Sequence, residues 1–350
     1  MDKIALIDDF LQNRYSLKEY PALEHQFKVW SAQRPLEGKK ILDGTPVFAN
    51  TLIKYKNLLA AGADLTVGYC DSIPFDPAII EFLQQIGIKT VYQSTQVDFY
   101  DVIADCNAAY RNLRPRCGFV ELTRSGAYHF AGSKSPVINV DDSRIKAIET
   151  CLGTGESFLR AMKYLDYDVT GKKIVVMGCG KVGRGVVFYA GRAGAEVVAV
   201  DDPQLVKKCV NGTLISRFER EQVKAALHSA WCVVSCTGQA DALADAEYIE
   251  LVLNGTQIMV NMGVEDEWGK AVPPERVLNN KEPLNFILEE PTLLRYIDPT
   301  MALHNHAVLE LVQTEYRPGI RRISAVAHDD YWRIVEQYGI IAGELHVAGL

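Results

Sequence analysis

Short apolar runs alternate with longer stretches of helical periodicity along the first part of the chain. An initial segment of about 35 residues has a helical pattern that ends at Arg34-Pro35. Beyond it, apolar runs typical of buried strands are separated by helical stretches near residues 49–61 and 77–85. Strands that alternate with helices indicate a parallel sheet with helices on both faces. The expected strands are residues 40–42, 65–69, 91–92, 101–104 and 118–122.

The same alternation returns later in the chain, so a second α/β unit is expected. A long helix from Asp142 toward Leu165, with an interruption expected at Gly153-Thr154-Gly155, leads into it. Strand-like runs then follow at residues 172–177, 196–200, 231–235 and 257–261.

The last part of the chain has a weaker pattern. After Asp298-Pro299, a helical run to about Tyr316 is expected to return the chain to the first unit. Residues from about Pro318 are expected to form a tail with little motif content. No internal repeat or low-complexity segment interrupts this organisation.

A glycine-rich turn follows the first strand of the second unit. The motif Gly178-Cys179-Gly180-Lys181-Val182-Gly183 stands between the strand 172–177 and a helical run from Val186 to Arg192. Strand, GxGxxG turn and helix in this order are the dinucleotide-binding fingerprint. Gly178 permits the tight turn, Gly180 lets the backbone approach a pyrophosphate, and Gly183 lets the helix pack against the strand. The free N–H groups of the helix N-terminus then favour phosphate.

An acidic residue at the end of the next strand indicates which dinucleotide binds. Asp201 follows the strand 196–200, about 20 residues beyond the first glycine, as the fingerprint requires. A carboxylate there accepts hydrogen bonds from both ribose hydroxyls and repels a 2′-phosphate. Lys207 and Lys208 follow at helical positions, where a solvated face is the simpler interpretation. The sequence therefore predicts NAD rather than NADP.

These elements predict a two-domain α/β protein. The Rossmann NAD-binding domain is expected at residues 151–297, and a discontinuous α/β substrate domain at residues 1–150 plus 298–350. A length of 350 residues is enough for two separate cores.

Charge and hydropathy exclude several partners. The net charge of −7 argues against nucleic acid, which demands clustered Lys and Arg. No apolar run approaches the length of a membrane span, and the N-terminus lacks a signal-peptide pattern, so we expect a cytoplasmic protein. The eight cysteines include no CxxC pair and are expected as free thiols. His304 and His306 point to different helix faces, and no metal site is expected.

Several motifs resemble the S-adenosylhomocysteine hydrolases, over roughly residues 21–312. They are residues 31–38, residues 136–143 with Lys146 after them, and residues 171–201 including an additional glycine at Gly185. The resemblance implies two domains that close over a tightly bound NAD, which takes a hydride from the substrate and later returns it. It also implies that Thr237-Gly238 and Asn261-Met262-Gly263 contact the cofactor, and that Thr123 and Arg124 lie near the nicotinamide ribose.

The chain departs from that family where substrate chemistry is expected. Active-site histidines of the family are replaced by Pro46, Val264 and Asp298, and its Glu-Glu-Thr-Thr-Thr motif reads Glu121-Leu122-Thr123-Arg124-Ser125. The family's C-terminal tail, which reaches a neighbouring protomer's cofactor, is also expected to have no counterpart. Among the family's chemical residues Lys146 is clearly kept. A homo-oligomer, with a dimer favoured, is nevertheless expected.

The candidate site residues follow from these matches and departures. Lys146 is the expected base or hydroxyl-orienting group, against an exposed pair with Asp142. Arg124 or Arg295 would hold an anionic end of the substrate, and His129 could move a proton. Asp298 is either catalytic or a plain helix N-cap. The expected cofactor-binding residues are Gly178, Gly180, Lys181, Val182, Gly183, Asp201, Thr237, Gly238, Asn261, Gly263 and Thr123.

Three functions are therefore open at this point. The first is an NAD-dependent oxidoreductase or lyase that acts on a small polar, possibly anionic, metabolite. The second is a divergent adenosylhomocysteinase-type hydrolase with relocated catalytic groups. The third is an NAD-binding sensor without turnover. Because a site built to pair ribose hydroxyls loses affinity when its partners vanish, the departures favour the first.

Overall fold

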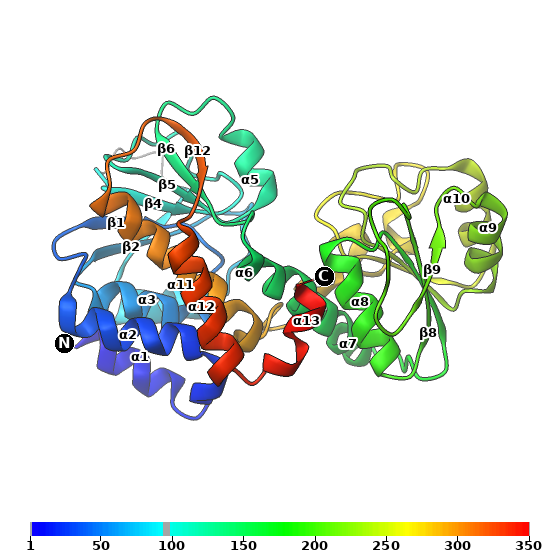
Figure 1. The fold of residues 1–350 in the computed structure, drawn as a ribbon, viewed down its shortest axis with the longest axis horizontal. Coiled ribbons are helices and arrows are strands. Elements are labelled where there is room, and N and C mark those ends of the chain that lie inside the picture. Colours follow the sequence, from blue (N-terminus) through cyan, green and yellow to red (C-terminus); the bar gives the residue numbers. More distant parts are fainter. Residues whose placement is uncertain (1, 94–98, 350) are drawn as a thin grey trace. The chain divides into compact units, whose positions relative to one another are not determined.

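The computed structural model describes residues 2–93 and 99–349, which form two compact units (Figure 1). The first unit contains residues 2–146 and 294–343, and the second contains residues 147–293 and 344–349. Each is built on one parallel sheet, so the α/β class with a Rossmann-type unit is confirmed. The end of the chain, which the sequence assigned wholly to the first unit, packs with the second from Glu344 onward.

The first unit is built on a seven-stranded parallel sheet, in the order β12-β6-β5-β4-β1-β2-β3. Its central strands are buried along nearly their whole length, because helices cover the sheet. The strands are β1 (Lys40–Asp43), β2 (Asp64–Tyr69), β3 (Lys89–Tyr92), β4 (Val102–Asp105), β5 (Gly118–Glu121), β6 (Pro136–Asn139) and β12 (Gly319–Arg322).

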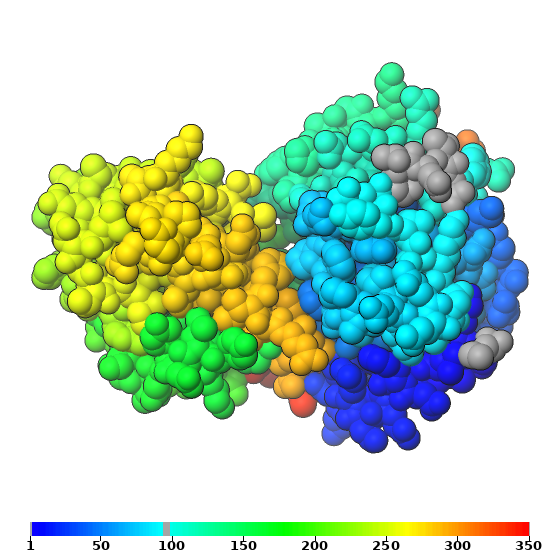
Figure 2. Space-filling view, turned by 180° about the vertical axis from the view of Figure 1, so that it is seen from behind, coloured from blue at the N-terminus to red at the C-terminus, as the bar shows by residue number. Residues whose placement is uncertain are grey.

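The helices of the first unit come from both ends of the sequence. The orange and red helices α11 and α12 lie beside the blue α2 in Figure 1, and α11 packs against α2, α3, β4 and β5. In Figure 2 the dark-blue surface of the first unit belongs to its N-terminal segments. The elements are α1 (Lys3–Leu11), η1 (Leu17–Glu19), α2 (Pro21–Gln33), α3 (Thr51–Ala60), α4 (Pro77–Gln85), α5 (Arg124–His129), α6 (Arg144–Ala147), α11 (Leu294–Gln313), α12 (Ala325–Tyr338) and η6 (Ala342–Glu344).

Two expectations for the last part of the chain are wrong. Helix α11 begins at Leu294 and passes through Pro299, whereas the sequence placed its start after Asp298-Pro299. The expected tail contains β12, which pairs in parallel with β6, and α12, which packs on α11 and α2. A four-residue edge strand carries too little periodicity for detection from sequence, and its partner lies far away in the chain.

The second unit has a five-stranded parallel sheet, in the order β11-β10-β7-β8-β9. On the face seen in Figure 2, the yellow and orange surface belongs to the segment between α10 and α11. The strands are β7 (Lys173–Met177), β8 (Glu196–Asp201), β9 (Thr213–Ser216), β10 (Cys232–Ser235) and β11 (Ile258–Asn261). The helices are α7 (Thr154–Tyr164), α8 (Lys181–Arg192), α9 (Arg220–Ser229), α10 (Ala246–Asn254) and α13 (Leu345–Ala348), with short turns η3 (Pro274–Arg276), η4 (Leu278–Lys281) and η5 (Leu284–Ile287).

The segment expected as one long helix is helical with a different interruption. Between α6 and α7 stands a π-helical segment, η2 (Ile148–Gly153), so the irregularity precedes the expected Gly153-Thr154-Gly155 break. The glycines of this region allow close helix packing rather than a break in the helix. A Cβ on Gly155 would overlap the backbone of Gly185, and a Cβ on Gly185 would overlap the Cys151 carbonyl. The additional glycine after the dinucleotide motif therefore lets α8 lie directly against η2 and α7.

Candidate functional site

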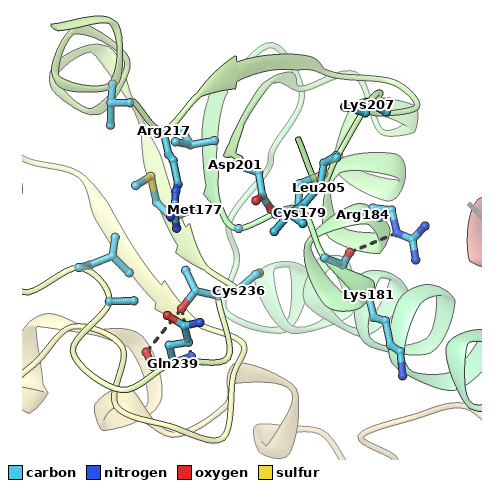
Figure 3. A pocket seen from close by; sticks show the side chains of 18 of the residues that line it. Met177, Cys179, Lys181, Arg184, Asp201, Leu205, Lys207, Arg217, Cys236 and Gln239 are labelled. Atoms are coloured by element: carbon cyan, nitrogen blue, oxygen red, sulfur yellow. Dashed lines mark hydrogen bonds between the residues drawn. The ribbon is translucent and has the colours of Figure 1, made fainter. Parts of the chain in front are cut away.

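A cavity of about 780 Å³ opens at the carboxyl end of the sheet in the second unit. It is lined by the glycine turn after β7, the end of β8, the loop after β8 and the end of β10 (Figure 3). Ligands of open parallel sheets bind in this position. The cavity lies within the range of small-molecule and cofactor sites.

The three motif glycines have the surroundings that their expected roles require. Gly178 has a φ of +95°, and a Cβ there would approach the Cys236 carbonyl oxygen to 2.7 Å. A Cβ on Gly183 would overlap the Gly178 carbonyl, so this glycine permits the close contact between α8 and the turn. In front of Gly180, by contrast, a Cβ would meet nothing within 4 Å. The open space lies where a pyrophosphate must approach the start of α8.

Asp201 is held at the cavity by the backbone. Its Oδ2 accepts a hydrogen bond from the Cys179 N–H at 2.5 Å, and its Oδ1 accepts one from the Asp202 N–H at 2.6 Å. Figure 3 shows its carboxylate beside Cys179, facing the cavity. Each oxygen can accept further hydrogen bonds, because a carboxylate offers about four acceptor positions. The carboxylate is therefore oriented and still able to receive two hydroxyls.

Several cationic residues line the same cavity as this carboxylate. Lys207 and Lys208 are exposed as expected, but they belong to the irregular loop after β8 and line the cavity, so their expected place on a helix is wrong. The Lys207 ammonium donates to the Pro203 carbonyl at 2.8 Å, a bond that folds the loop on itself. The other cationic lining residues are Lys181, Arg184 and Arg217. This charge suits a ligand that carries phosphates.

Two side chains organise the turns after β10 and β11, and sequence reasoning missed one of them, Glu267. The buried Glu267 accepts hydrogen bonds from the N–H groups of Thr237 and Gly238, at 2.8 and 2.7 Å, and from the Thr237 hydroxyl. Asn261 donates to three backbone carbonyls, including that of Gly263, and accepts from the Gly263 N–H. Glu267 follows no strand directly, so no motif marks it.

The expected cofactor residues of the second unit are therefore not equivalent. Thr237 and Lys181 line the cavity together with the first two glycines and Asp201. Val182 packs against the hydrophobic core beneath the turn. Among the described residues that line the cavity, Gly238, Asn261 and Gly263 do not occur, and their contacts are those of turn formation.

In the first unit, acidic residues also stand at the carboxyl ends of parallel strands, but they accept hydrogen bonds from nearby groups of the same unit. Asp105 ends β4 and accepts from the N–H groups of Tyr110 and Cys106. Glu121 ends β5 and accepts from the N–H groups of Asn107, Ala108 and Thr123 and from the Thr123 hydroxyl. Burial raises the pKa of both carboxyls above their usual values.

A buried ion pair stands at the end of β1. Asp43 is that strand's last residue, and it contacts Lys54 of α3 and the Thr45 hydroxyl. The Lys54 side chain is 1% exposed, so its charge depends on the adjacent Asp43 carboxylate, because burial alone disfavours an ammonium ion. Neither residue belongs to a motif, although an acid at a strand end and a lysine inside an apolar helical run could have drawn attention.

Lys146 lies in α6, at the last position of the first unit, and is 4% exposed. The alternative of an exposed pair with Asp142 is therefore wrong, because Lys146 is buried. Arg322 approaches Asp142, at 3.8 Å. The Ser143 hydroxyl accepts the Lys146 N–H and so helps to form the short helix. The positive charge of Lys146 also contributes to lowering the pKa of the buried His304.

Asp298 caps a different helix from the one expected. Its two carboxylate oxygens accept the N–H groups of Ala22 and Leu23, at 3.0 and 2.8 Å, in the first turn of α2. The N-cap position of α2 is Tyr20, whose side chain makes no capping hydrogen bond, so Asp298 supplies the missing acceptor. Burial raises the pKa of Asp298 to about 8. Its interpretation as the N-cap of its own helix is wrong, because it lies inside α11.

The remaining candidates of the first unit lie apart along α5 and α11. Thr123 is the N-cap of α5, where its hydroxyl accepts the Gly126 N–H. Arg124 is exposed and donates to the Tyr128 hydroxyl at 2.8 Å. His129 is exposed at the end of the same helix. Arg295 pairs with Glu19 at 3.2 Å.

Two further properties concern membranes and metal ions. In the part of the chain that the structure describes, no helix is long and apolar enough to cross a membrane. Within residues 2–93 and 99–349, no group of three or more His, Cys, Asp or Glu side chains could hold a metal ion.

Comparison with curated proteins identifies distant relatives. An S-inosyl-L-homocysteine hydrolase from Methanopyrus kandleri is 28% identical over 264 residues, which are 66% of this chain and 60% of that protein. Adenosylhomocysteinases from Thermoplasma acidophilum and Archaeoglobus fulgidus are 22% and 26% identical, over 73% and 71% of this chain. The chain spans 60–68% of the length of these three relatives. No protein-family model matches the chain.

Solved structures resemble the chain in fold. A dipicolinate synthase chain from Bacillus halodurans superposes with a TM-score of 0.52 at 12% identity, over 80% of this chain and 99% of that one. A transhydrogenase from Sinorhizobium meliloti also gives a TM-score of 0.52, at 15% identity, over 79% of this chain and 96% of that one. At these identities the likeness concerns the fold alone. The curated relatives confirm the resemblance that the sequence motifs indicated.

Proposed function

We propose that this chain, a divergent member of the S-adenosylhomocysteine hydrolase family, is an NAD-dependent oxidoreductase or lyase that acts on a small polar metabolite. The observation that carries the proposal is the cavity of the second unit. It combines open space before Gly180, the N-terminus of α8 and the oriented carboxylate of Asp201.

The residues of the cavity fit a dinucleotide. The N–H groups at the start of α8 would bind the pyrophosphate, and Lys181 and Arg184 would balance its charge. Asp201 would accept the two hydroxyls of the adenosine ribose. Bound NAD would supply an acceptor for a hydride from the substrate.

NAD is proposed rather than NADP because the negatively charged Asp201 carboxylate faces the cavity. Two backbone hydrogen bonds hold the Asp201 carboxylate at the cavity, where a 2′-phosphate would meet it directly. Lys207, Lys208 and Arg217 act in the opposite direction, but all three are exposed. An exposed cation is screened by water, so it offsets the charge of a nearby carboxylate only weakly.

The strand ends of the first unit support a substrate other than a nucleoside thioether. Asp105 and Glu121 use their oxygens for the backbone of the chain, and Asp298 caps α2. Together with Pro46, Leu122 and Val264 at the family's substrate positions, this leaves few groups to pair a sugar's hydroxyls. In the proposed mechanism Lys146 orients a substrate hydroxyl and accepts its proton.

An anionic end of the substrate would be held by Arg124 rather than by Arg295. Arg295 is half-buried and already pairs with Glu19. Arg124 is exposed on the first turn of α5, and its Nε donates to a neutral phenol. Its guanidinium therefore keeps the donors that a carboxylate or phosphate needs.

The proposal is tested in three steps on the purified protein. Calorimetric titration should show binding of NAD and weaker binding of NADP. A thiol-release assay with S-adenosylhomocysteine and S-inosylhomocysteine should show no turnover at an ordinary enzymatic rate, on the order of 1 per second. A metabolite screen should then find compounds that reduce the bound nicotinamide, which is seen from its absorbance.

Each rival function has its own outcome in that experiment. Thiol release at an ordinary rate would overturn the proposal in favour of a homocysteine-releasing hydrolase, the activity named for the curated relatives. NAD binding with no reduction by any metabolite and no thiol release would favour an NAD-binding sensor. Absence of dinucleotide binding would overturn all three.

A further inference from the structure

Two cysteine side chains contact each other beside the glycine-rich turn. The Sγ atoms of Cys179 and Cys209 lie 2.9 Å apart. Cys179 is the residue between the first two motif glycines, and Cys209 belongs to the loop after β8 that lines the same cavity through residues 205–208. The two thiols therefore join the phosphate-binding turn to a loop that forms one wall of the site.

We propose that Cys179 and Cys209 form a reversible disulfide on reaction with a hydroperoxide, and that this bond holds the loop after β8 against the glycine turn. A disulfide needs a sulfur–sulfur distance of about 2.05 Å, so the sulfurs must approach by less than 1 Å. The movement falls on Cys209, because its loop is irregular while Cys179 is fully buried in the turn.

The two thiols differ in the way that such a reaction requires. Cys209 is half-buried, and the hydrogen bond from Cys179 lowers its thiol pKa, so it is the group that reaches the thiolate form. The same hydrogen bond, together with burial, raises the pKa of Cys179. Cys209 is thus suited to attack the oxidant and Cys179 to resolve the product.

The reaction needs only the peroxide as oxidant and the two thiols. The Cys209 thiolate attacks the peroxide O–O bond, which gives a sulfenic acid and releases hydroxide or an alkoxide. The Cys179 thiol then attacks the sulfenic sulfur, a disulfide forms, and water leaves with the thiol proton. Both electrons end on the peroxide oxygens. A dithiol reductant reverses the change by thiol–disulfide exchange.

The other thiols of the second unit have no comparable arrangement. Cys151, Cys232 and Cys236 are buried, and desolvation raises the pKa of each, which suppresses the reactive thiolate. Cys151 contacts the Val347 carbonyl at 3.9 Å. The pairing of a half-exposed thiol with a buried partner therefore selects Cys209 and Cys179.

The Cys179–Cys209 disulfide would slow the exchange of a ligand bound in the cavity. This part of the inference rests on the proposed function, because it takes the cavity as a dinucleotide site. Leu205, Val206, Lys207 and Lys208 line the cavity and immediately precede Cys209. A bond that holds this loop to the turn restricts the opening through which a ligand leaves.

The site is tested first without any dinucleotide. The native protein is treated with hydrogen peroxide, its free thiols are blocked, and the protein is digested without reductant. The expected result is a loss of two hydrogens per chain and a cross-linked peptide pair that contains Cys179 and Cys209. The melting temperature should rise by roughly 5–10 °C, because the bond restricts the unfolded chain. Another pairing, or oxidation of Cys209 to sulfinic acid without a disulfide, would overturn the proposal.

The second measurement uses NADH as the probe and follows its release by fluorescence. Release should be several-fold slower from the oxidised protein than from the reduced protein, and a dithiol should restore the fast rate. The variant Cys209→Ser should show the fast rate with or without peroxide, while the matched control Cys117→Ser, in the first unit, should behave like the parent. Equal rates for oxidised and reduced parent would overturn the effect on exchange. Failure of NADH to bind would instead overturn the proposed function, and the peptide mapping would still decide the disulfide.

Discussion

The two units present the same kind of sheet edge and use it in opposite ways. In the second unit, the carboxyl ends of β7, β8 and β10 border a cavity of about 780 Å³, and Asp201 faces it with acceptor positions to spare. In the first unit, β1, β4 and β5 end in Asp43, Asp105 and Glu121, which are completely buried. One edge is open to a ligand, and the other is closed by the chain's own donors.

The difference lies in what the carboxylates bind. Asp201 accepts two backbone N–H groups, from Cys179 in the glycine turn and from the adjacent Asp202, and these orient it without covering it. Glu121 accepts four hydrogen bonds, three of them from the backbone, and Tyr110 packs over Gly44 and Gly68 at the same sheet edge. An acid at a strand end is thus a binding group in one unit and a structural clamp in the other.

The largest expected effect is a loss of turnover when Lys146 of the first unit is replaced. It would show that the first unit takes part in catalysis although its sheet edge is closed. Lys146→Met keeps the apolar stem and removes the ammonium. On any metabolite that reduces the bound nicotinamide, the rate should fall by about 10²–10⁴-fold, because a positioned base is lost. NAD affinity and melting temperature should stay close to those of the parent. The matched control is Arg144→Met, which removes an exposed cation two positions away on the same short helix. An equal rate in Lys146→Met and the parent would show that the base lies elsewhere.

The second prediction concerns the clamp at the end of β1. Lys54→Met leaves Asp43 as a buried charge without its cation, so the free energy of unfolding should fall by about 3–5 kcal/mol in urea denaturation. The double variant Asp43→Leu/Lys54→Met should recover much of this loss, because no uncompensated charge remains. Additive losses in the double variant would mean that the two residues do not act as a pair.

The third prediction concerns the open edge. Asp201→Ala should weaken NAD binding by about 10–100-fold, in line with about 1.5–3 kcal/mol for hydrogen bonds to a charged group. It should weaken NADP binding less, because the repulsion of the 2′-phosphate also disappears. Calorimetric titration with both dinucleotides gives the ratio. Asp202→Ala is the control, since its carboxylate accepts the Gln204 N–H rather than facing the same turn. Unchanged NAD affinity in Asp201→Ala would mean that this carboxylate does not contact the ribose.

The last prediction concerns a pH dependence of the first unit. The pKa of Asp298 is raised to about 8 in the folded protein, above the usual value of 3.8. The folded state therefore binds this proton more tightly than the unfolded state, and the stability from Asp298 falls as pH rises from about 4 to 8. Asp298→Asn, which cannot ionise, should show a flatter decline in the free energy of unfolding over this range. An identical slope in parent and variant would contradict the raised pKa.

Much of the second unit could be predicted from sequence because its signals are local. The dinucleotide turn, the helix after it and Asp201 lie within one βαβ segment, and a Cβ on Gly183 would overlap the Gly178 carbonyl of the same turn. The first unit was predictable in its alternation of strands and helices, but not in its edge strand. β12 lies beside β6 although about 180 residues separate them, and pairing over such distances leaves no local pattern.

By itself, the sequence determined the α/β class, the two units and the place of the dinucleotide turn, because hydrophobic periodicity and glycine conformation act between near neighbours. The tertiary structure alone decided what each polar group does. It brought Asp298 to the N-terminus of α2, Glu267 to the turn at Thr237, and Cys209 to Cys179. Such contacts depend on which distant segments the packed core brings together, and a buried donor or acceptor must find its partner there.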